Sequence, residues 1–279
     1  MTPMRHATEA FFMAARSGQR LCIYHPPAGS AARGSVVYVH PWAEEMNKSR
    51  RMAALQARAL AAAGIGVLIL DLFGTGDSAG EFRDARWAIW LADVRAASTW
   101  LERSLGRPVQ LLGLRLGGLL AASAAVAEPN RFPRLILWQP VADGHTMLTQ
   151  FLRVRIAASL DNAASRETTE ALRAELSAGR TLEVAGYEVA PELAAALDAA
   201  RLDGLVPSGA TTIDWVDVTA AADAALPAAR RKVVESWRAA GASISITTVA
   251  GEPFWSTQEV TLAPELLAAT QRLLATCPA

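Results

Sequence analysis

The sequence has no excess of charge of either sign, because 27 lysines and arginines balance 27 aspartates and glutamates. Nucleic-acid-binding proteins generally carry a basic excess, so we expect no nucleic-acid partner. The chain also lacks a long hydrophobic run. The apolar stretches at 64–70 and 116–127 are shorter than the roughly 20 residues that a membrane-spanning helix needs. They predict a core strand and a core helix, with no insertion into a membrane.

Cysteine is scarce as well. Cys22 and Cys277 lie near opposite ends of the chain and form neither a Cys-x-x-Cys pair nor a metal-ligand spacing. We therefore expect no metal site and no cofactor, and this cysteine usage suits a reducing compartment. Residues 1–20 contain no uncharged apolar run of signal-peptide length. Together these features predict a cytoplasmic protein.

Apolar residues, by contrast, are abundant. They make up 52% of the sequence, charged residues make up 19%, and the mean hydropathy is +0.19. Such a composition supports a large core and shows no sign of disorder. A length of 279 residues suits one α/β sheet covered by helices, so we predict a single domain over 1–279.

The hydrophobic pattern predicts an α/β fold. Two short apolar runs joined by Ser17-Gly18 predict an opening hairpin, after which short apolar strands alternate with helix-length segments, as in a mostly parallel sheet. The eight expected strands are 9–15, 19–24, 35–39, 66–71, 109–113, 135–139, 212–218 and 244–249. The expected helices are 48–63, 85–105, 117–127, 227–240 and 263–275.

The alternation of strands and helices fails over about 147–208. This stretch is rich in alanine, glutamate and arginine, has helical periodicity, and contains a turn signal near Gly186. We interpret it as a helical cap inserted after the sixth strand. Its alanine-rich tracts also suit ordinary surface helix, because alanine has the highest helix propensity.

Three motifs follow strands of the predicted sheet, at the edge where doubly wound folds bind ligands. They are His40-Pro41-Trp42, the pattern Asp-x-x-Gly-x-Gly-x-Ser-x-Gly at 71–80, and Gly-Leu-Arg-Leu-Gly-Gly at 113–118. In this order they resemble the α/β-hydrolase fold. Within that fold the chain is most similar to the second type of exosortase A system-associated hydrolase, whose elbow carries arginine. That resemblance implies a bacterial role near exopolysaccharide production and exosortase-dependent protein sorting.

In an α/β hydrolase the nucleophile elbow is Gly-x-Ser-x-Gly, with the serine on a strained strand-to-helix turn. Gly113 and Gly117 occupy the two glycine positions here, but the central residue is Arg115. A guanidinium stays protonated at accessible pH and has no nucleophilic lone pair. The elbow therefore cannot form an acyl-enzyme.

The histidines give an independent test. The chain has only four, His6, His25, His40 and His145, whereas the base of the fold would follow the eighth strand near 251–255. Glu252 stands in that region, and Asp223 is available at the acid position after the seventh strand. An acid without an imidazole to orient has no role in a triad. We therefore do not expect conventional Ser-His-Asp hydrolysis.

Arg115 has two alternative interpretations. At the N-terminal end of a helix, where anions are already favoured, it could grip a ligand carboxylate or phosphate. Alternatively it pairs with an internal acid, Glu44, Asp143 or Glu252, and fills the former cavity, because a buried arginine generally needs a partner. Both remain open from the sequence. The pair Glu44-Glu45 itself is expected to face solvent.

Several other residues are candidates for lining the pocket. His40, Pro41 and Trp42 occupy the oxyanion-loop position, and Leu116 follows the elbow. Asp143 and His145 follow the sixth strand, where they suit either an acid–base pair or ordinary turn chemistry, and we favour the turn.

Three functional hypotheses follow. The first is a pseudoenzyme that binds a small anionic or acyl-bearing ligand. The second is a hydrolase of unusual mechanism, in which Arg115 is an electrophilic clamp. Its acid–base groups would be a carboxylate and a histidine, chosen from Asp143, Asp223 or Glu252 and from His40 or His145. The third is a module that binds a protein partner and has a filled pocket. An open cavity would argue against the third, and a histidine within about 3 Å of a carboxylate inside it would favour the second.

Overall fold

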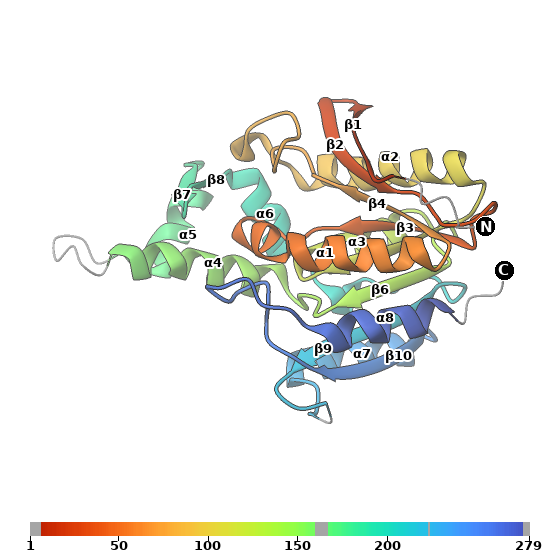
Figure 1. The fold of residues 1–279 in the computed structure, drawn as a ribbon. Helices are drawn as coiled ribbons and strands as arrows, with labels where there is room; N and C mark the ends of the chain where they lie inside the picture. The colour runs from red at the N-terminus through yellow and green to blue at the C-terminus, as the bar shows by residue number, and fades with distance from the viewer. Residues whose placement is uncertain (1–6, 160–166, 223, 276–279) are drawn as a thin grey trace.

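An eight-stranded sheet forms the centre of the computed structural model, which describes residues 7–159, 167–222 and 224–275. The strand order is β1-β2-β4-β3-β5-β6-β9-β10, and only the β1–β2 and β2–β4 pairs are antiparallel (Figure 1). The strands are β1 (Glu9–Ala15), β2 (Gly18–His25), β3 (Gly34–Val39), β4 (Ile65–Leu70), β5 (Val109–Leu114), β6 (Arg134–Trp138), β9 (Thr212–Thr219) and β10 (Ser243–Ala250). The predicted α/β-hydrolase sheet is confirmed.

Helices cover both faces of this sheet, as expected. They are α1 (Glu44–Ala62), α2 (Trp87–Leu105), α3 (Leu116–Ala127), α7 (Ala228–Ala239) and α8 (Pro264–Ala275). Buried residues of α1 and α8 belong to one apolar cluster, whereas those of α2, α3 and α7 belong to a second cluster across the sheet. The central strands β3, β4 and β5 are buried along their whole length, which explains why their sequences are continuous apolar runs rather than alternating ones.

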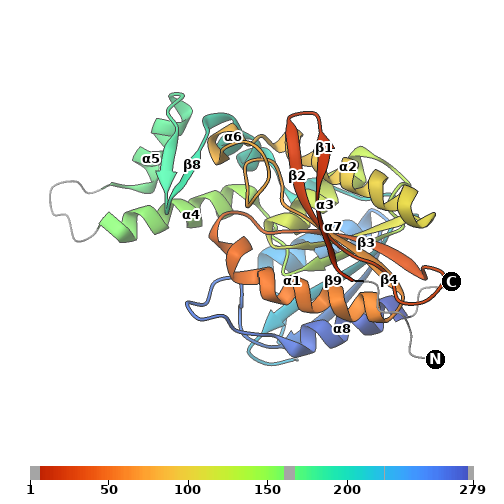
Figure 2. The same cartoon turned by 45° about the horizontal axis from the view of Figure 1, so that its top comes forward.

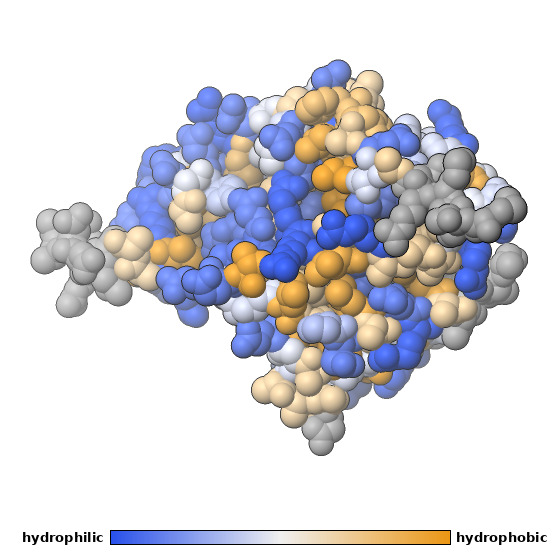
Figure 3. All heavy atoms as spheres, in the orientation of Figure 1, coloured by the Kyte–Doolittle hydropathy of each residue, from blue (hydrophilic) through white to orange (hydrophobic). Residues whose placement is uncertain are grey.

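Residues 144–159 and 167–204, here called the inserted segment, lie between β6 and β9 in the chain. In Figures 1 and 2 the segment projects beyond the edge of the sheet at which the parallel strands end. Its surface in Figure 3 is mostly hydrophilic, whereas apolar residues gather over the middle of the molecule. Its elements are α4 (Gly144–Ser159), α5 (Thr169–Ser177), β7 (Leu182–Val184), β8 (Tyr187–Val189), α6 (Pro191–Ala199) and the 3₁₀ turn η2 (Leu202–Gly204).

The inserted segment differs in two ways from the helical stretch predicted over 147–208. Its first helix begins earlier, at Gly144, and its middle is a two-stranded hairpin rather than a helix. Ala185 and Gly186 form the turn with φ of 50° and 82°, the left-handed geometry that favours a tight hairpin. Strands of three residues are too short to show a period of two. Residues 160–166 of the predicted stretch lie outside the described residues.

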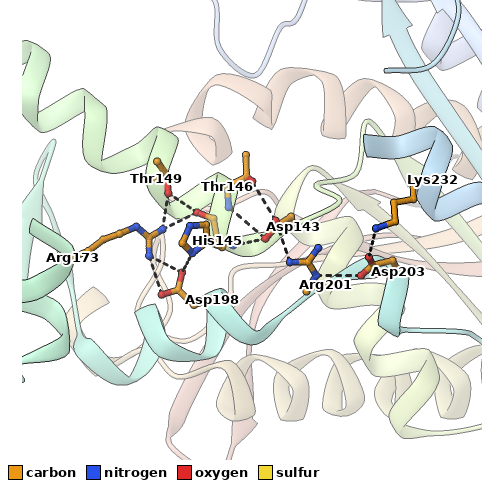
Figure 4. A network of polar contacts seen from close by, with 9 residues as sticks. All are labelled: Asp143, His145, Thr146, Thr149, Arg173, Asp198, Arg201, Asp203 and Lys232. Carbon is orange, nitrogen blue, oxygen red and sulfur yellow. Dashed lines mark hydrogen bonds and ion pairs between the residues drawn. The ribbon is translucent and has the colours of Figure 1, made fainter. Parts of the chain in front are cut away.

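Ion pairs and hydrogen bonds tie the inserted segment together and join it to the core (Figure 4). Asp198 of α6 accepts hydrogen bonds from Arg173 of α5 and lies 3.1 Å from Nδ1 of His145 on α4. Asp203 of η2 pairs with Lys232 of α7 at 3.9 Å. In the described part of the chain, no helix is both long and apolar enough to cross a membrane.

Candidate functional site

Arg115 occupies a strained turn between β5 and α3. Its φ of 56° and ψ of −118° are unfavourable for a residue with a side chain, and such strain persists only where surrounding contacts fix it. The Arg115 N–H donates to the carbonyl of Trp138 at 3.0 Å, and the Val141 N–H donates to the carbonyl of Arg115 at 3.2 Å. The turn is therefore held against the end of β6, in the geometry of a nucleophile elbow.

The two elbow glycines are required by close backbone packing. A Cβ atom on Gly117 would lie 2.3 Å from the carbonyl oxygen of Val39 and 2.5 Å from that of His40. A Cβ atom on Gly113 would lie 2.4 Å from the carbonyl oxygen of Gly117. Only glycine allows β3, β5 and α3 to approach in this way, so the elbow is retained in full except for its central residue.

The Arg115 side chain is paired. Its Nε lies 3.1 Å from Oε1 of Glu45, and the two side chains are only 15% and 12% exposed. The Trp255 ring centroid lies 5.6 Å from the guanidinium carbon, and Met147 Sδ lies 3.6 Å from Nη2. The prediction that Glu44-Glu45 faces solvent is therefore wrong, because Glu45 is paired with Arg115 and Oε2 of Glu44 is buried as well. The internal partner of Arg115 is thus Glu45, which was not among the three acids suggested by the sequence.

Burial and the ion pair act in opposite directions on Glu45. Burial raises the pKa of its carboxyl above the usual value, and the charge of Arg115 lowers it. Among the described residues, Oε2 of Glu45 and Oε2 of Glu44 are buried without a hydrogen-bond partner. Arg115 is thus the main group that stabilises the charged form of Glu45.

A cavity of about 280 Å³ lies beside Arg115, between α4, η2 and the start of α7. Its lining carries the four cations Arg115, Arg201, Arg230 and Lys232, and the two acids Asp143 and Asp203. Arg201 and Lys232 are 52% and 75% exposed, and ion pairs at such sites contribute little free energy. The ion pairs of Arg201 and Lys232 therefore hold these two side chains only weakly.

Asp217 of β9, the ion-pair partner of the cavity residue Arg230, is a residue that the sequence analysis missed. It is fully buried, accepts a hydrogen bond from Nε1 of Trp215 at 2.8 Å, and is ion-paired with Arg230. Burial raises the pKa of Asp217, whereas Arg230 and Arg115 lower it. A polar residue at an inward-facing position of a buried strand is the signal that could have identified it.

The motif after β3, His40-Pro41-Trp42, contributes no residue to the lining of this cavity. His40 and Pro41 are buried, and burial lowers the pKa of His40 to about 4, with Nε2 at 3.8 Å from Oδ1 of Asp71. Trp42 is buried against Phe151, with ring centroids 4.7 Å apart. Leu116, also predicted to contact ligand, lies in the apolar core.

Asp143 immediately precedes α4, and His145 is the second residue of that helix. Asp143 lines the cavity and caps the helix, because its Oδ1 accepts from the His145 N–H at 2.9 Å. The His145 ring instead points to Asp198 and is 53% exposed (Figure 4). The expected turn is therefore a helix cap, and the two side chains do not form an acid–base pair inside the cavity.

Of the two remaining candidates, only Glu252 belongs to the described residues. Glu252 is exposed, and Trp255 lies over Arg115 in its place. Asp223 lies outside the described residues. Among the described residues, no histidine lines the cavity, and no group of three or more histidines, cysteines and carboxylates is placed to hold a metal ion.

Residues 30–233 match the family model described as serine aminopeptidase, S33. No curated protein matches the chain. Among solved structures, Est1E of Butyrivibrio proteoclasticus with bound ferulic acid is 16% identical, with a TM-score of 0.68 over 96% of this chain and 99% of that one. A thermostable carboxyl esterase from Bacillus coagulans is 11% identical, with a TM-score of 0.67 over 98% and 99%. A serine hydrolase without a lid from Xanthomonas campestris is 15% identical, with a TM-score of 0.60 over 98% and 96%.

Proposed function

Because the chain belongs to the serine aminopeptidase S33 family of α/β hydrolases, we propose that it is a pseudoenzyme of that family that binds a small anionic or acyl-bearing ligand at the elbow. The observation that carries this proposal is the open cavity beside Arg115, whose lining holds four cations and two acids. A volume of about 280 Å³ is close to the lower end for small-molecule sites. It accommodates a metabolite-sized ligand.

Pairing with Glu45 does not remove Arg115 from this role. Glu45 contacts Nε and the sulfur of Met147 contacts Nη2, while Arg115 itself lines the cavity, where its terminal nitrogens would meet a carboxylate or phosphate. A guanidinium fixed by one acid is pre-oriented for a second. The two interpretations that the sequence left open therefore combine, with Glu45 as the support and the ligand as the second acceptor.

The rival hypotheses have less support. An unusual hydrolase needs a histidine beside a carboxylate in the cavity, and His40 and His145 both lie outside its lining. A pure interaction module would be expected to have a filled pocket. The open cavity favours a small ligand, without arguing against an additional protein partner.

The setting of this function is proposed from the sequence motif. The elbow Gly-Leu-Arg-Leu-Gly resembles that of the exosortase A system-associated hydrolases, second type, which supports a cytoplasmic role beside exopolysaccharide production in a bacterium. Deleting the gene in such an organism should then change exopolysaccharide or exosortase-dependent sorting, while a strain that retains both unchanged would contradict this setting.

The purified protein should not hydrolyse p-nitrophenyl esters and should not react with fluorophosphonate probes, because the elbow carries no serine. Arg115→Ser should remain inactive as well, since no base stands ready to activate the new hydroxyl. Ester hydrolysis by the variant would show that a base has been overlooked. Stoichiometric labelling of the unchanged protein would contradict the proposal.

A panel of carboxylates and phosphates should raise the melting temperature. A ligand at 100 times its Kd adds about 2.7 kcal/mol to the free energy of unfolding. Arg201→Gln should weaken binding of the stabilising anion about tenfold, because one charge-assisted hydrogen bond is lost. The matched control Arg103→Gln, on the exposed last turn of α2, should bind normally. If no anion stabilises the protein, the interaction module becomes the better hypothesis.

A further inference from the structure

Strand β1 forms one edge of the eight-stranded sheet, and among the described residues no strand lies on its outer side. An edge strand presents unpaired N–H and C=O groups, which proteins commonly protect with lysine, proline or a β-bulge. The sequence of β1, Glu-Ala-Phe-Phe-Met-Ala-Ala, contains neither lysine nor proline. Its register with β2 runs from Glu9–Tyr24 to Ala15–Gly18 without a bulge. None of these three devices protects this edge, and its backbone is therefore able to pair with a further strand.

Apolar side chains flank the β1 edge on both faces of the sheet. On one face Phe12 is 54% exposed, and Leu21, which lies opposite it on β2, is half-buried. On the other face Phe11 packs against Trp100 of α2 with ring centroids 4.7 Å apart, and both rings are only partly buried. Figure 3 shows apolar side chains gathered at the top of the molecule, where Figure 1 places β1 and β2. A contiguous apolar surface beside an open strand edge is typical of an interaction site.

The charges beside this apolar surface lie at the two ends of β1. Glu9 begins the strand, Arg16 follows its last residue, and both are exposed. If two copies of β1 pair in antiparallel orientation about Phe12, Glu9 of each copy lies opposite Ala15 of the other, next to Arg16. Opposite charges then meet at both ends of the paired strands, and apolar residues meet in the middle. A parallel arrangement would instead bring like charges together, which is unfavourable. The strand is thus complementary to a second copy of itself in the antiparallel orientation.

We propose that the protein forms a two-fold symmetric dimer through antiparallel pairing of β1 with β1 of a second copy, with the two Phe12 residues directly opposite each other. The sheets of the two copies then form one continuous sheet. Two-fold symmetry is the commonest arrangement of homo-oligomers, and aromatic residues directly opposite each other stabilise an antiparallel pair. The proposed interface is separate from the cavity beside Arg115, because no residue of β1 or β2 lines that cavity. The inference therefore goes beyond the proposed ligand binding and does not depend on it.

Sedimentation velocity of the full chain tests for this dimer over a concentration range of about 1 to 100 μM, because an interface built on one strand edge is smaller than that of a permanent dimer. The unchanged protein should pass from monomer to dimer as its concentration rises. Phe12→Lys should raise the dissociation constant at least about tenfold, because it places two like charges opposite each other in the centre of the interface. Since Phe12 is 54% exposed, the variant should keep the melting temperature of the monomer.

The matched control is Ser243→Lys, which adds the same charge at the exposed start of β10, the opposite edge of the sheet. It should dimerise as the unchanged protein does. Loss of the dimer in Ser243→Lys but not in Phe12→Lys would assign the interface to β10 and overturn the proposal. A protein that stays monomeric over the whole range would overturn it as well.

Disulfide cross-linking tests the register of the two strands. Cys22 is buried, and a Cys277→Ser background removes the other native thiol. Phe12→Cys should form a covalent dimer on mild oxidation, because Cβ atoms directly opposite in an antiparallel pair lie about 4.5 to 5.5 Å apart. Ala10→Cys is the matched control and should not cross-link, since its counterpart lies about 14 Å away along the strand. Cross-linking by Ala10→Cys but not by Phe12→Cys would contradict the proposed pairing.

Discussion

Replacing Arg115 with methionine should lower the free energy of unfolding by about 3 kcal/mol, because the change removes the ion-pair partner of the largely buried Glu45. For a chain of this size that loss corresponds to a fall in melting temperature of roughly 6 to 12 °C. An unpaired receptor arginine would give the opposite result, since its removal would leave stability unchanged or higher. The contact with Glu45 decides between these outcomes.

The loss of stability caused by Arg115→Met should depend on pH. Burial raises the pKa of Glu45 and Arg115 lowers it, so the variant should have a still higher pKa at this carboxyl. When folding raises the pKa of a carboxyl group, the protein loses stability as the pH rises from the pKa of the unfolded state to that of the folded state. The gap between variant and unchanged protein should therefore be smaller at pH 5 than at pH 8, as measured by thermal unfolding at both.

Two further variants serve as controls for the melting experiment. Arg103→Met makes the same change on an exposed turn of α2 and should melt close to the unchanged protein. The double variant Arg115→Met with Glu45→Gln removes the stranded charge and should recover part of the loss. An unchanged melting temperature for Arg115→Met alone would show that the ion pair does not stabilise the elbow.

Replacing Arg20 with methionine should have an effect at least as large, about 3 to 5 kcal/mol. Arg20 of β2 and Asp93 of α2 are joined at 2.8 Å, and their side chains are 1% and 2% exposed. Asp93 also accepts the Phe73 N–H at 2.8 Å, which holds the loop after β4. Burial raises the pKa of Asp93 and Arg20 lowers it, so the variant leaves a buried carboxylate without its cation.

The exposed pair of Arg83 and Glu188, at 3.4 Å and 56% and 44% exposure, is the matched comparison for Arg20. Arg83→Met should cost less than about 1 kcal/mol, because exposed ion pairs contribute little. Urea unfolding of both variants measures the difference. Equal midpoints for the two variants would mean that burial does not set the contribution of the Arg20–Asp93 pair.

Periodicity was sufficient to predict the sheet, because burial on both faces makes β3, β4 and β5 continuous apolar runs. It was insufficient in the inserted segment, where β7 and β8 are three residues each and carry no detectable alternation. Motif spacing likewise placed Arg115 at the elbow. Asp217 was missed because a single aspartate in an apolar strand has no motif, although its burial requires a partner such as Arg230.

The sequence by itself determined what the elbow lacks. Arg115 stands between Gly113 and Gly117, and no histidine follows the eighth strand. Both facts can be read from the sequence without knowledge of the tertiary structure. Only the tertiary structure decided what Arg115 contacts. An arginine side chain is long, and several acids lie within reach of the strand ends, so the partner depends on how α1 and the inserted segment pack around the turn. That packing places Glu45 and Trp255 against the guanidinium, brings Arg201 and Lys232 to the cavity wall, and sends His145 toward Asp198.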